Sequence, residues 1–186
     1  MSLIAGNLGA VQRLLDEAGL AWGVCSGTAA HLYGVRRPIQ NVDILLPEGY
    51  LRQVRDLLRE NKRVAQYDGR ILLWRGIKLF DDLPVTIDGR RHLFLMDALM
   101  QERLRRLPLL GSRVLVISPE DALAQKALLV RAEDSPGKHH REDFEAIARM
   151  QGNSLDLNYL VQRLDLCQVR GQTEALFQEV GLSLPS

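Results

Sequence analysis

The chain has 186 residues, of which 46% are hydrophobic and 25% are charged, and its formal net charge is +1. This balance is ordinary for a soluble globular protein, and it excludes a class that binds nucleic acid or anionic membranes through global charge. No run approaches the ~20 apolar residues of a membrane span, and the N-terminus has no signal-peptide pattern. Cys25 and Cys167 are far apart in sequence. We expect both to be reduced, in a cytoplasmic protein.

Hydrophobic periodicity predicts alternating helices and strands in the first part of the chain. The expected helices are Leu8–Ala18, Thr28–Tyr33 and a helix that Pro47 opens. The expected strands are Trp22–Cys25 and Val42–Leu46. Proline fits the first turn of a helix because that turn leaves its N–H groups unbonded in any case.

From Arg63 onward the pattern favours strands. Asp68-Gly69 predicts a hairpin turn between Arg63–Tyr67 and Ile71–Trp74. Further strands are expected at Ile77–Phe80, Val85–Ile87 and Arg113–Ile117, and a helix at Met96–Leu104.

The last third of the chain has a helical pattern. Ser118-Pro119-Glu120-Asp121 predicts a helix start, with serine as N-cap and proline at the first helical position. Three further helices are expected around His140–Met150, Leu155–Leu164 and Thr173–Val180. The sequence therefore predicts an α+β protein, with a core of residues 1–117 and a helical region of residues 118–186. The helical region either packs on the core as a second domain or forms one domain with it.

The segment from Ser26 to Leu46 carries the chemistry. Asn41 and Asp43 are two residues apart on an expected strand, so their side chains share one face. They follow a small-residue turn at Ser26-Gly27. Two oxygen-bearing side chains beside such a turn suit a divalent cation held against a nucleoside triphosphate. Asn41, however, supplies a neutral amide where a carboxylate is expected.

These residues resemble the polymerase-beta-like nucleotidyltransferase superfamily, in particular its small minimal and abortive-infection-type members. The family pattern is a Gly-Gly or Gly-Ser turn, a short helix, an Arg-x-Thr-x loop and Asp-x-Asp on a strand. Arg37 and Asp43 match this pattern, while Ile39 replaces the threonine and Asn41 the first aspartate.

The resemblance continues downstream, so that it covers most of residues 20–165. Val114–Lys126 resembles the family's strand, Ser-Pro-Glu-Asp turn and lysine-bearing helix, and Arg141 and Asp143 resemble its basic-acidic helix. The resemblance implies a nucleotidyltransferase-like mixed β-sheet core flanked by helices, with a helical C-terminal third.

The resemblance also implies an activity, the transfer of a nucleoside monophosphate from a triphosphate to the hydroxyl of an unknown acceptor. Two Mg²⁺ ions support that reaction in the family. Asp43 is then the main catalytic residue and metal ligand, with Asn41 as its weak partner. Ser26, Gly27 and Arg37 are expected around the phosphates of the nucleotide. Lys126 either approaches the triphosphate or extends from an apolar helix face.

The third carboxylate of the family site is the difficulty. By register, its position on the strand Ile77–Phe80 falls on Lys78, whose ammonium repels a metal ion. Asp81, Asp82 and Asp88 are alternatives if the register differs. We therefore expect a degenerate metal site with weak or no Mg²⁺ binding, and the sequence leaves open whether transferase activity remains.

The alternative function is an inactive scaffold or interaction protein, such as the partner of a helical toxin. The exposed basic helix starts and the C-terminal helices would then form the contact surface. Arg90-Arg91-His92 adds local positive charge, but few aromatic residues are present for base stacking. The sequence therefore argues against direct nucleic-acid binding.

Overall fold

The structure is a computed structural model, and it describes residues 3–135 and 139–186. The chain forms two compact units. The first comprises residues up to Thr28, Pro38–Leu83 and Leu95–Ile117, and the second comprises Ala29–Arg37, Pro84–Phe94 and Ser118–Ser186. The last crossing from the first unit to the second follows Ile117. Two earlier segments, Ala29–Arg37 and Pro84–Phe94, also belong to the second unit. A division into domains 1–117 and 118–186 stays a prediction.

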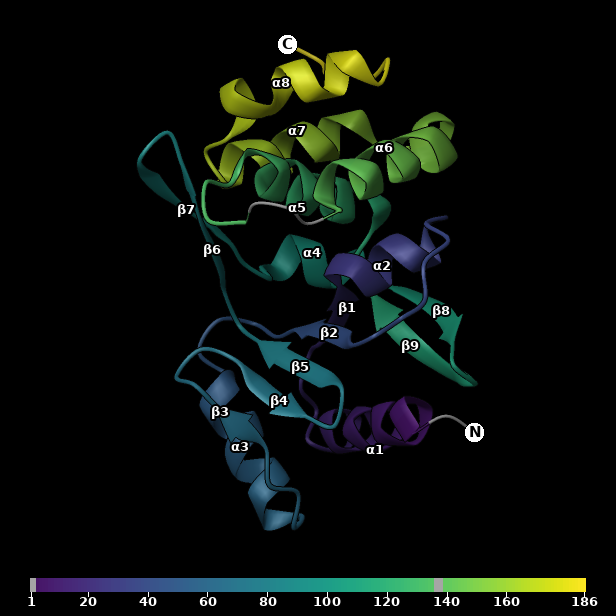
Figure 1. Ribbon diagram of the computed structural model, residues 1–186, viewed down its shortest axis with the longest axis vertical. Coiled ribbons are helices and arrows are strands. Elements are labelled where there is room, and N and C mark those ends of the chain that lie inside the picture. Colours follow the sequence, from purple (N-terminus) through teal and green to yellow (C-terminus); the bar gives the residue numbers. More distant parts are fainter. Residues whose placement is uncertain (1–2, 136–138) are drawn as a thin grey trace. The chain divides into compact units, whose positions relative to one another are not determined.

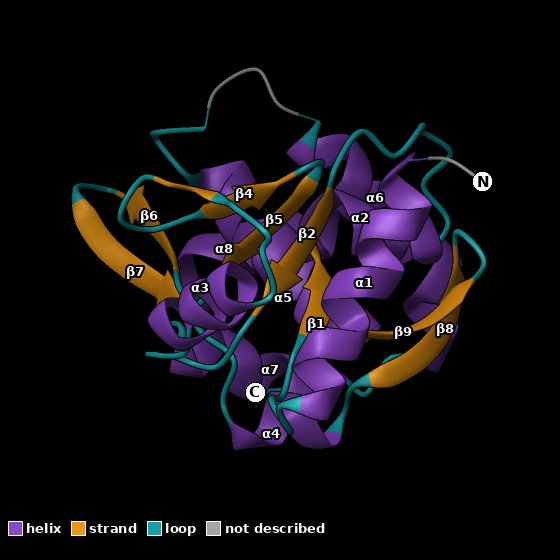
Figure 2. Cartoon of the chain, turned by 90° about the horizontal axis from the view of Figure 1, so that it is seen from below, coloured by secondary structure: helices purple, strands orange, loops and turns teal. Residues whose placement is uncertain are grey.

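A seven-stranded mixed sheet forms the centre of the first unit, with the strand order β3-β4-β5-β2-β1-β9-β8 (Figure 2). The strands are β1 (Gly23–Cys25), β2 (Val42–Leu45), β3 (Gln66–Tyr67), β4 (Leu72–Trp74), β5 (Ile77–Phe80), β8 (Arg105–Leu109) and β9 (Ser112–Val116). β2 pairs with β1 in antiparallel and with β5 in parallel orientation, and β1 pairs with β9 in parallel orientation. β2 is therefore held on both sides by hydrogen-bonded neighbours.

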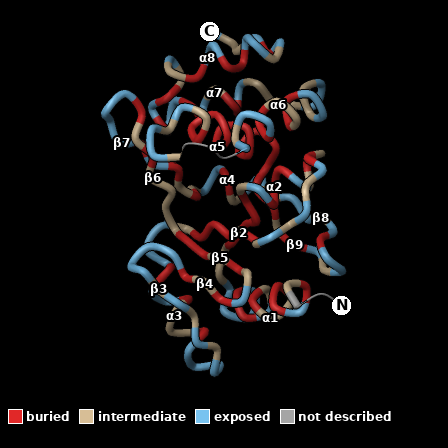
Figure 3. Tube along the Cα trace, viewed as in Figure 1, coloured by how far each residue is buried: buried red, intermediate tan, exposed pale blue. Residues whose placement is uncertain are grey.

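Three helices belong to the first unit, α1 (Leu3–Glu17), α3 (Leu51–Glu60) and α4 (Ala98–Glu102). A fourth, α2 (Ser26–Leu32), begins there directly after β1. α1 contacts β5 and β9. The central strands are buried almost throughout (red in Figure 3), and Val42, Ile44 and Leu79 have no exposed surface. Burial of these β-branched and leucine side chains supplies the main stabilisation of the sheet.

The second unit is mainly helical (Figure 1). Its helices are α5 (Pro119–Arg131), α6 (His140–Gln151), α7 (Leu157–Leu166) and α8 (Arg170–Glu179), with a short 3₁₀ turn at Gly152–Ser154. α5 contacts α6, α7 and α8, and its residues Pro119–Leu129 are all buried. A two-stranded ribbon of β6 (Leu83–Ile87) and β7 (Arg90–Phe94) accompanies the helices. Within the described ranges, no helix combines the length and the apolar character that crossing a bilayer requires.

Most of the predicted elements are present, but the prediction that Pro47 opens a helix is wrong. α3 begins at Leu51. Pro47 instead forms an isolated parallel bridge with Met96, and Gly49 has a φ of +85° that no helix accepts. The carboxylate of Asp81 accepts hydrogen bonds from the backbone N–H groups of Gly49 and Leu51 at 3.0 and 3.2 Å. The start of α3 is thus set by a residue 30 positions away.

Two strands, β7 and β8, were not predicted. β8 is the edge strand of the sheet, carries Arg105 and Arg106, and contains Pro108. Charged residues and proline are tolerated at an edge because one side of the strand forms no hydrogen bonds. The same residues mask the strand pattern in the sequence.

A buried polar cluster at the start of α5 joins the helices of the second unit. Ser118 caps α5 as predicted, with its Oγ accepting from the N–H of Asp121 at 3.1 Å. The Asp121 carboxylate accepts from the Tyr159 hydroxyl at 3.0 Å and lies 2.9 Å from the Arg163 guanidinium. Burial raises the pKa of Asp121, and the Arg163 charge opposes that rise. The cluster thus links α5 to α7 through an ion pair that is out of contact with water.

We expect Asp121→Ala to lower the free energy of unfolding by ~3–5 kcal/mol, because it leaves the buried Arg163 charge uncompensated. Urea denaturation followed by circular dichroism measures this change. Asp165→Ala is the matched control on α7. Asp165 is exposed, and its ion pair with Arg170 is long, at 3.8 Å. That variant is expected to lose at most about 1 kcal/mol. Equal losses in the two variants would contradict the structural role of Asp121.

Candidate functional site

The turn after β1 lies beside the predicted metal ligands. Cys25, the last residue of β1, is the strand partner of Asp43 in β2. The next residue, Ser26, has a φ of +53°, in the left-handed region that non-glycine residues rarely adopt. The Thr28 hydroxyl donates a hydrogen bond to the carbonyl oxygen of Asn41 at 3.0 Å. These contacts bring the Ser26-Gly27 turn together with Asn41 and Asp43 in the first unit.

Gly27 is exposed, and a Cβ added to it would meet no heavy atom within 4 Å. The space over this residue is therefore open. Packing does not require glycine here, but a ligand that approaches the backbone of the turn closely would require it. Ser26 and Gly27 are themselves the first two residues of α2, and the backbone N–H groups of a helix start suit an anion.

Asp43 and Lys78 occupy the same position on neighbouring strands. β2 and β5 pair in parallel, with Asp43 opposite Lys78. Both residues are half-buried, while Val42 and Ile44 on either side of Asp43 are fully buried. Side chains of directly paired residues project to the same face of a sheet. The structure thus puts Lys78 beside Asp43, and that this is the position of the third carboxylate stays a prediction.

The donor set at this position does not fit the two-metal site of the family. The Asp43 carboxylate and the Lys78 ammonium together carry no net formal charge, and Asn41, which directly precedes β2, would add only a neutral amide. Hard divalent cations need several charged oxygen ligands. Within the described ranges, no group of three His, Cys, Asp or Glu side chains is arranged to hold a metal ion.

The three alternative aspartates have other surroundings. Asp81 binds the backbone at the start of α3, and Asp82 lies 3.8 Å from Arg70. Asp88 is exposed in the turn between β6 and β7, in the second unit.

A cavity of about 320 Å³ reaches Lys78. Leu73 lines it together with Lys78, and the two residues are strand partners, so the cavity lies on the face of the sheet that carries Asp43. Tyr67, Asp68 and Ile71 complete most of its wall. The backbone N–H groups of Arg70 and Ile71 hold the pKa of Asp68 below its usual range, so this wall carries a carboxylate at neutral pH.

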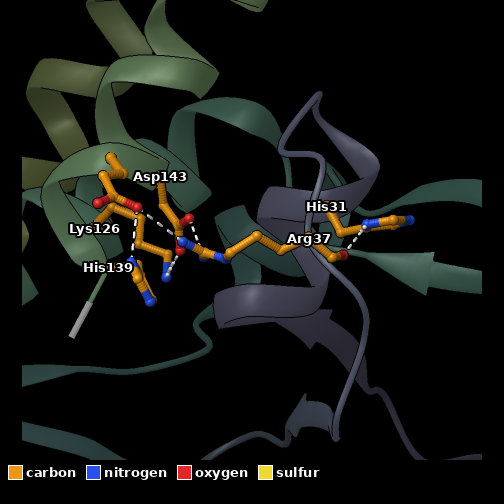
Figure 4. A network of polar contacts seen from close by, with 6 residues as sticks. His31, Arg37, Lys126, His139 and Asp143 are labelled. Atoms are coloured by element: carbon orange, nitrogen blue, oxygen red, sulfur yellow. Dashed lines mark hydrogen bonds and ion pairs between the residues drawn. The ribbon is translucent and has the colours of Figure 1, made fainter.

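The two predicted phosphate-binding cations, Arg37 and Lys126, lie in the second unit and meet at Asp143 (Figure 4). Lys126 Nζ donates to one oxygen of Asp143 at 2.7 Å, and Arg37 donates to the other. Arg37 also lies 3.4 Å from Glu142. The Lys126 and Asp143 side chains are 3% and 2% exposed, whereas the Arg37 side chain is 34% exposed.

Asp143 was known from the sequence only as part of a helix that resembles the family. The structure shows it as the common partner of both cations. A signal was present in the sequence, because Lys126 stands among apolar residues of a helix and a buried ammonium requires a counter-ion. That argument predicts a carboxylate without saying which of the 23 acidic residues supplies it.

Neither a family model nor a curated protein matches the chain. Solved structures do match it. The solution structure of the antibiotic-resistance factor ANT(2'')-Ia is 14% identical, with a TM-score of 0.57, over 94% of this chain and 95% of that one. The crystal structure of ANT(2'')-Ia in complex with adenylyl-2''-tobramycin is 13% identical, with a TM-score of 0.59, over 91% and 99%.

The lincosamide antibiotic adenylyltransferase LnuA also matches, at 11% identity and a TM-score of 0.47 over 77% of this chain and 95% of that one, which is too distant to add support. The two ANT(2'')-Ia structures establish that this chain has the nucleotidyltransferase fold, and the predicted α+β class is confirmed. Membership of the minimal or abortive-infection group stays a prediction.

We expect Lys126→Met to lower the free energy of unfolding by ~3–5 kcal/mol, because it removes one partner of a buried ion pair. Lys126→Met combined with Asp143→Leu is expected to recover much of this loss, since an apolar pair replaces the two charges. Chemical denaturation of the single and double variants measures both values. Arg131→Met, at an exposed cation of the same helix, is the control and should change stability by less than ~1 kcal/mol.

Proposed function

We propose that this protein is a nucleotidyltransferase-fold protein that binds a nucleoside triphosphate but has a degenerate metal site, with weak or no nucleotidyl transfer. The observation that supports this proposal most is the register of β2 and β5, which puts Lys78 opposite Asp43. Asn41 also lacks the negative charge that an aspartate would have at this position.

The charge at the site decides how well a metal ion binds. Two-metal transfer needs cations that neutralise the charge developing at the α-phosphate. Asp43 alone offers a charged oxygen, and the ammonium of Lys78 opposes a divalent cation on the same face. Lys78 carries a positive charge of its own, which would interact favourably with a phosphate. The same position thus disfavours metal binding and favours binding of an anionic nucleotide.

The phosphate contact that we propose in the first unit is the Ser26-Gly27 turn, while contact by Arg37 of the second unit stays a prediction from the sequence. The turn offers backbone N–H groups and open space over Gly27. Arg37 keeps about a third of its side chain exposed, whereas Lys126 is buried against Asp143. Of the two predicted cations, Arg37 is therefore the one with surface left for a ligand, and we assign to Lys126 the neutralisation of the buried Asp143 carboxylate.

Incubation with labelled nucleoside triphosphates, Mg²⁺ or Mn²⁺ and candidate acceptors tests the proposal directly. The acceptors should include protein, RNA 3′ ends and aminoglycosides such as tobramycin, since one structural neighbour is known in complex with adenylyl-2''-tobramycin. We expect little or no label transfer. Efficient transfer that Asp43→Ala abolishes would contradict a degenerate site.

The double variant Asn41→Asp, Lys78→Asp is expected to gain metal affinity. It restores two carboxylates beside Asp43, and three converging charged oxygens suit Mn²⁺ or Mg²⁺. Isothermal titration with MnCl₂ should show at least a tenfold lower Kd than for the wild-type protein. Arg105→Asp, which makes the same charge change as Lys78→Asp at an exposed residue of β8, is the control and should leave Mn²⁺ affinity unchanged. The same affinity in the wild-type protein and the double variant would contradict the metal geometry that we infer.

Gly27→Val is expected to weaken ATP binding at least tenfold while leaving the thermal unfolding temperature within about 3 °C of wild type. The added Cβ would meet no heavy atom within 4 Å, so the valine side chain extends into the open space where a ligand at the turn would lie. The change also gains roughly a few tenths of a kcal/mol of helix propensity, because glycine is a poorer helix former than valine. Gly171→Val in α8, where a Cβ would also meet no atom within 4 Å, is the matched control for that gain. Unchanged ATP affinity in Gly27→Val would exclude the turn as the phosphate site.

The alternative, an interaction protein that uses this fold as a scaffold, predicts a different result. Neither ATP nor GTP would then stabilise the protein in a thermal-shift assay. A protein such as a helical toxin, bound through the C-terminal helices, would stabilise it instead.

A further inference from the structure

A cavity of about 510 Å³ in the first unit is lined by three cations, Lys62, Arg63 and Arg75. Asn7 and Ala10 of α1 and the ring of Trp74 complete most of its wall. A volume of this size lies within the usual range of small-molecule sites. Among the residues that the structure describes, no carboxylate lines the cavity.

The cavity lies on the opposite face of the sheet from Asp43. Trp74 is the strand partner of Ile77, and Ile77 is the partner of Val42. Leu73, Lys78 and Asp43 form the neighbouring row of partners. Because successive residues of a strand point to opposite faces, the Trp74 row and the Asp43 row lie on different sides. The cavity is therefore separate from the nucleotide site proposed above.

The cations of this cavity are gathered without a counter-charge. Arg63 donates to the neutral carbonyl oxygen of Asn61 at 3.3 Å. The guanidinium carbons of Arg63 and Arg75 lie 5.7 and 5.6 Å from the centre of the Trp74 ring. Within the described part of the chain, none of the three cations forms an ion pair with a carboxylate. Converging like charges repel one another, and a bound anion relieves that repulsion.

Two of the cations also occupy backbone positions that favour other residues. Lys62 has a φ of +56° directly after α3, where its N–H bonds to the Arg59 carbonyl at 3.0 Å, a position at which glycine is usual. Arg75 has a φ of +47° at the first position of the two-residue turn between β4 and β5, where asparagine or glycine is favoured. Glycine or asparagine would therefore suit the backbone better at these two positions, so the backbone conformation does not account for the two charges.

We propose that this cavity is a second anion site, which binds a small polyphosphate group of the pyrophosphate class. Three cations match a ligand with several negative charges better than they match a single monoanion. The guanidinium groups offer paired N–H donors for phosphate oxygens, and the Lys62 ammonium adds a point charge. The polyphosphate belongs either to free pyrophosphate or to a nucleoside diphosphate or triphosphate.

Isothermal titration of the full chain with pyrophosphate, without metal, tests the proposal. Lys62→Gly and Arg75→Asn are each expected to weaken pyrophosphate binding at least tenfold, while the thermal unfolding temperature stays the same or rises. The rise follows from the positive φ at both positions, since the new residues accept it more readily. Arg59→Gln is the matched control, because Arg59 is an exposed cation of α3 outside the cavity, and it should leave binding unchanged.

Parallel titrations with inorganic phosphate, ADP and a single-stranded RNA identify the source of the phosphate. Tighter binding of ADP than of pyrophosphate assigns the site to a nucleotide, and the reverse assigns it to free pyrophosphate. Either result supports the proposal if Lys62→Gly weakens the binding. RNA binding without pyrophosphate binding would overturn it.

Pyrophosphate binding that Gly27→Val abolishes and Lys62→Gly leaves intact would also overturn the second site, because the anion would then occupy the proposed nucleotide site. The converse pattern would support the second site even if the nucleotide site proves not to exist. A lower unfolding temperature together with unchanged pyrophosphate affinity in Lys62→Gly and Arg75→Asn would assign these residues to the fold alone.

Discussion

The pairing of β2 with β1 on one side and β5 on the other is the constraint on which the site depends. It sets Cys25 and Lys78 as the two neighbours of Asp43. A shift of one residue would exchange the buried and the half-exposed faces of the strand, so the apolar side chains Val42 and Ile44 hold the register. Because core packing fixes the register, no residue of β5 other than Lys78 can pair with Asp43. The fold and the charge at the site are therefore fixed by the same interaction.

Two buried carboxylates in the helical unit, Asp121 and Asp143, are each stabilised by more than one polar partner. Asp121 joins α5 to α7 through Arg163 and Tyr159. Asp143 binds Lys126 and Arg37, and it joins α6 to α5 and to the loop that follows α2. In both cases a carboxylate has more than one partner, which offsets the cost of its desolvation. The second cluster holds both cations that the sequence predicts as phosphate-binding, Arg37 and Lys126, in ion pairs within the helical unit.

The distribution of charge suggests a protein that favours anions more than metal ions. On the Asp43 face, Lys78 lies beside Asp43. On the opposite face, three cations line a cavity to which no described residue contributes a carboxylate. Lys78 and the three cations of the cavity occupy half-exposed or exposed positions, so none of them disturbs the buried rows of the sheet. The charges at these positions can therefore differ between proteins of this fold without altering the packing of the core.

Local sequence signals determined much of this protein. Ser118 and Pro119 predicted the start of α5, Asp68-Gly69 predicted the hairpin, and the spacing from the strand Ile77–Phe80 predicted Lys78 opposite Asp43. These three predictions are correct because capping, turn chemistry and strand alternation depend on residues close in the chain. Only the tertiary structure decided the start of α3, the partner of Lys126, the edge strand β8 and the cationic cavity. Each of these depends on residues that are distant in sequence, such as Asp81 for α3 and Asp143 for Lys126, and no local pattern encodes which distant residue arrives.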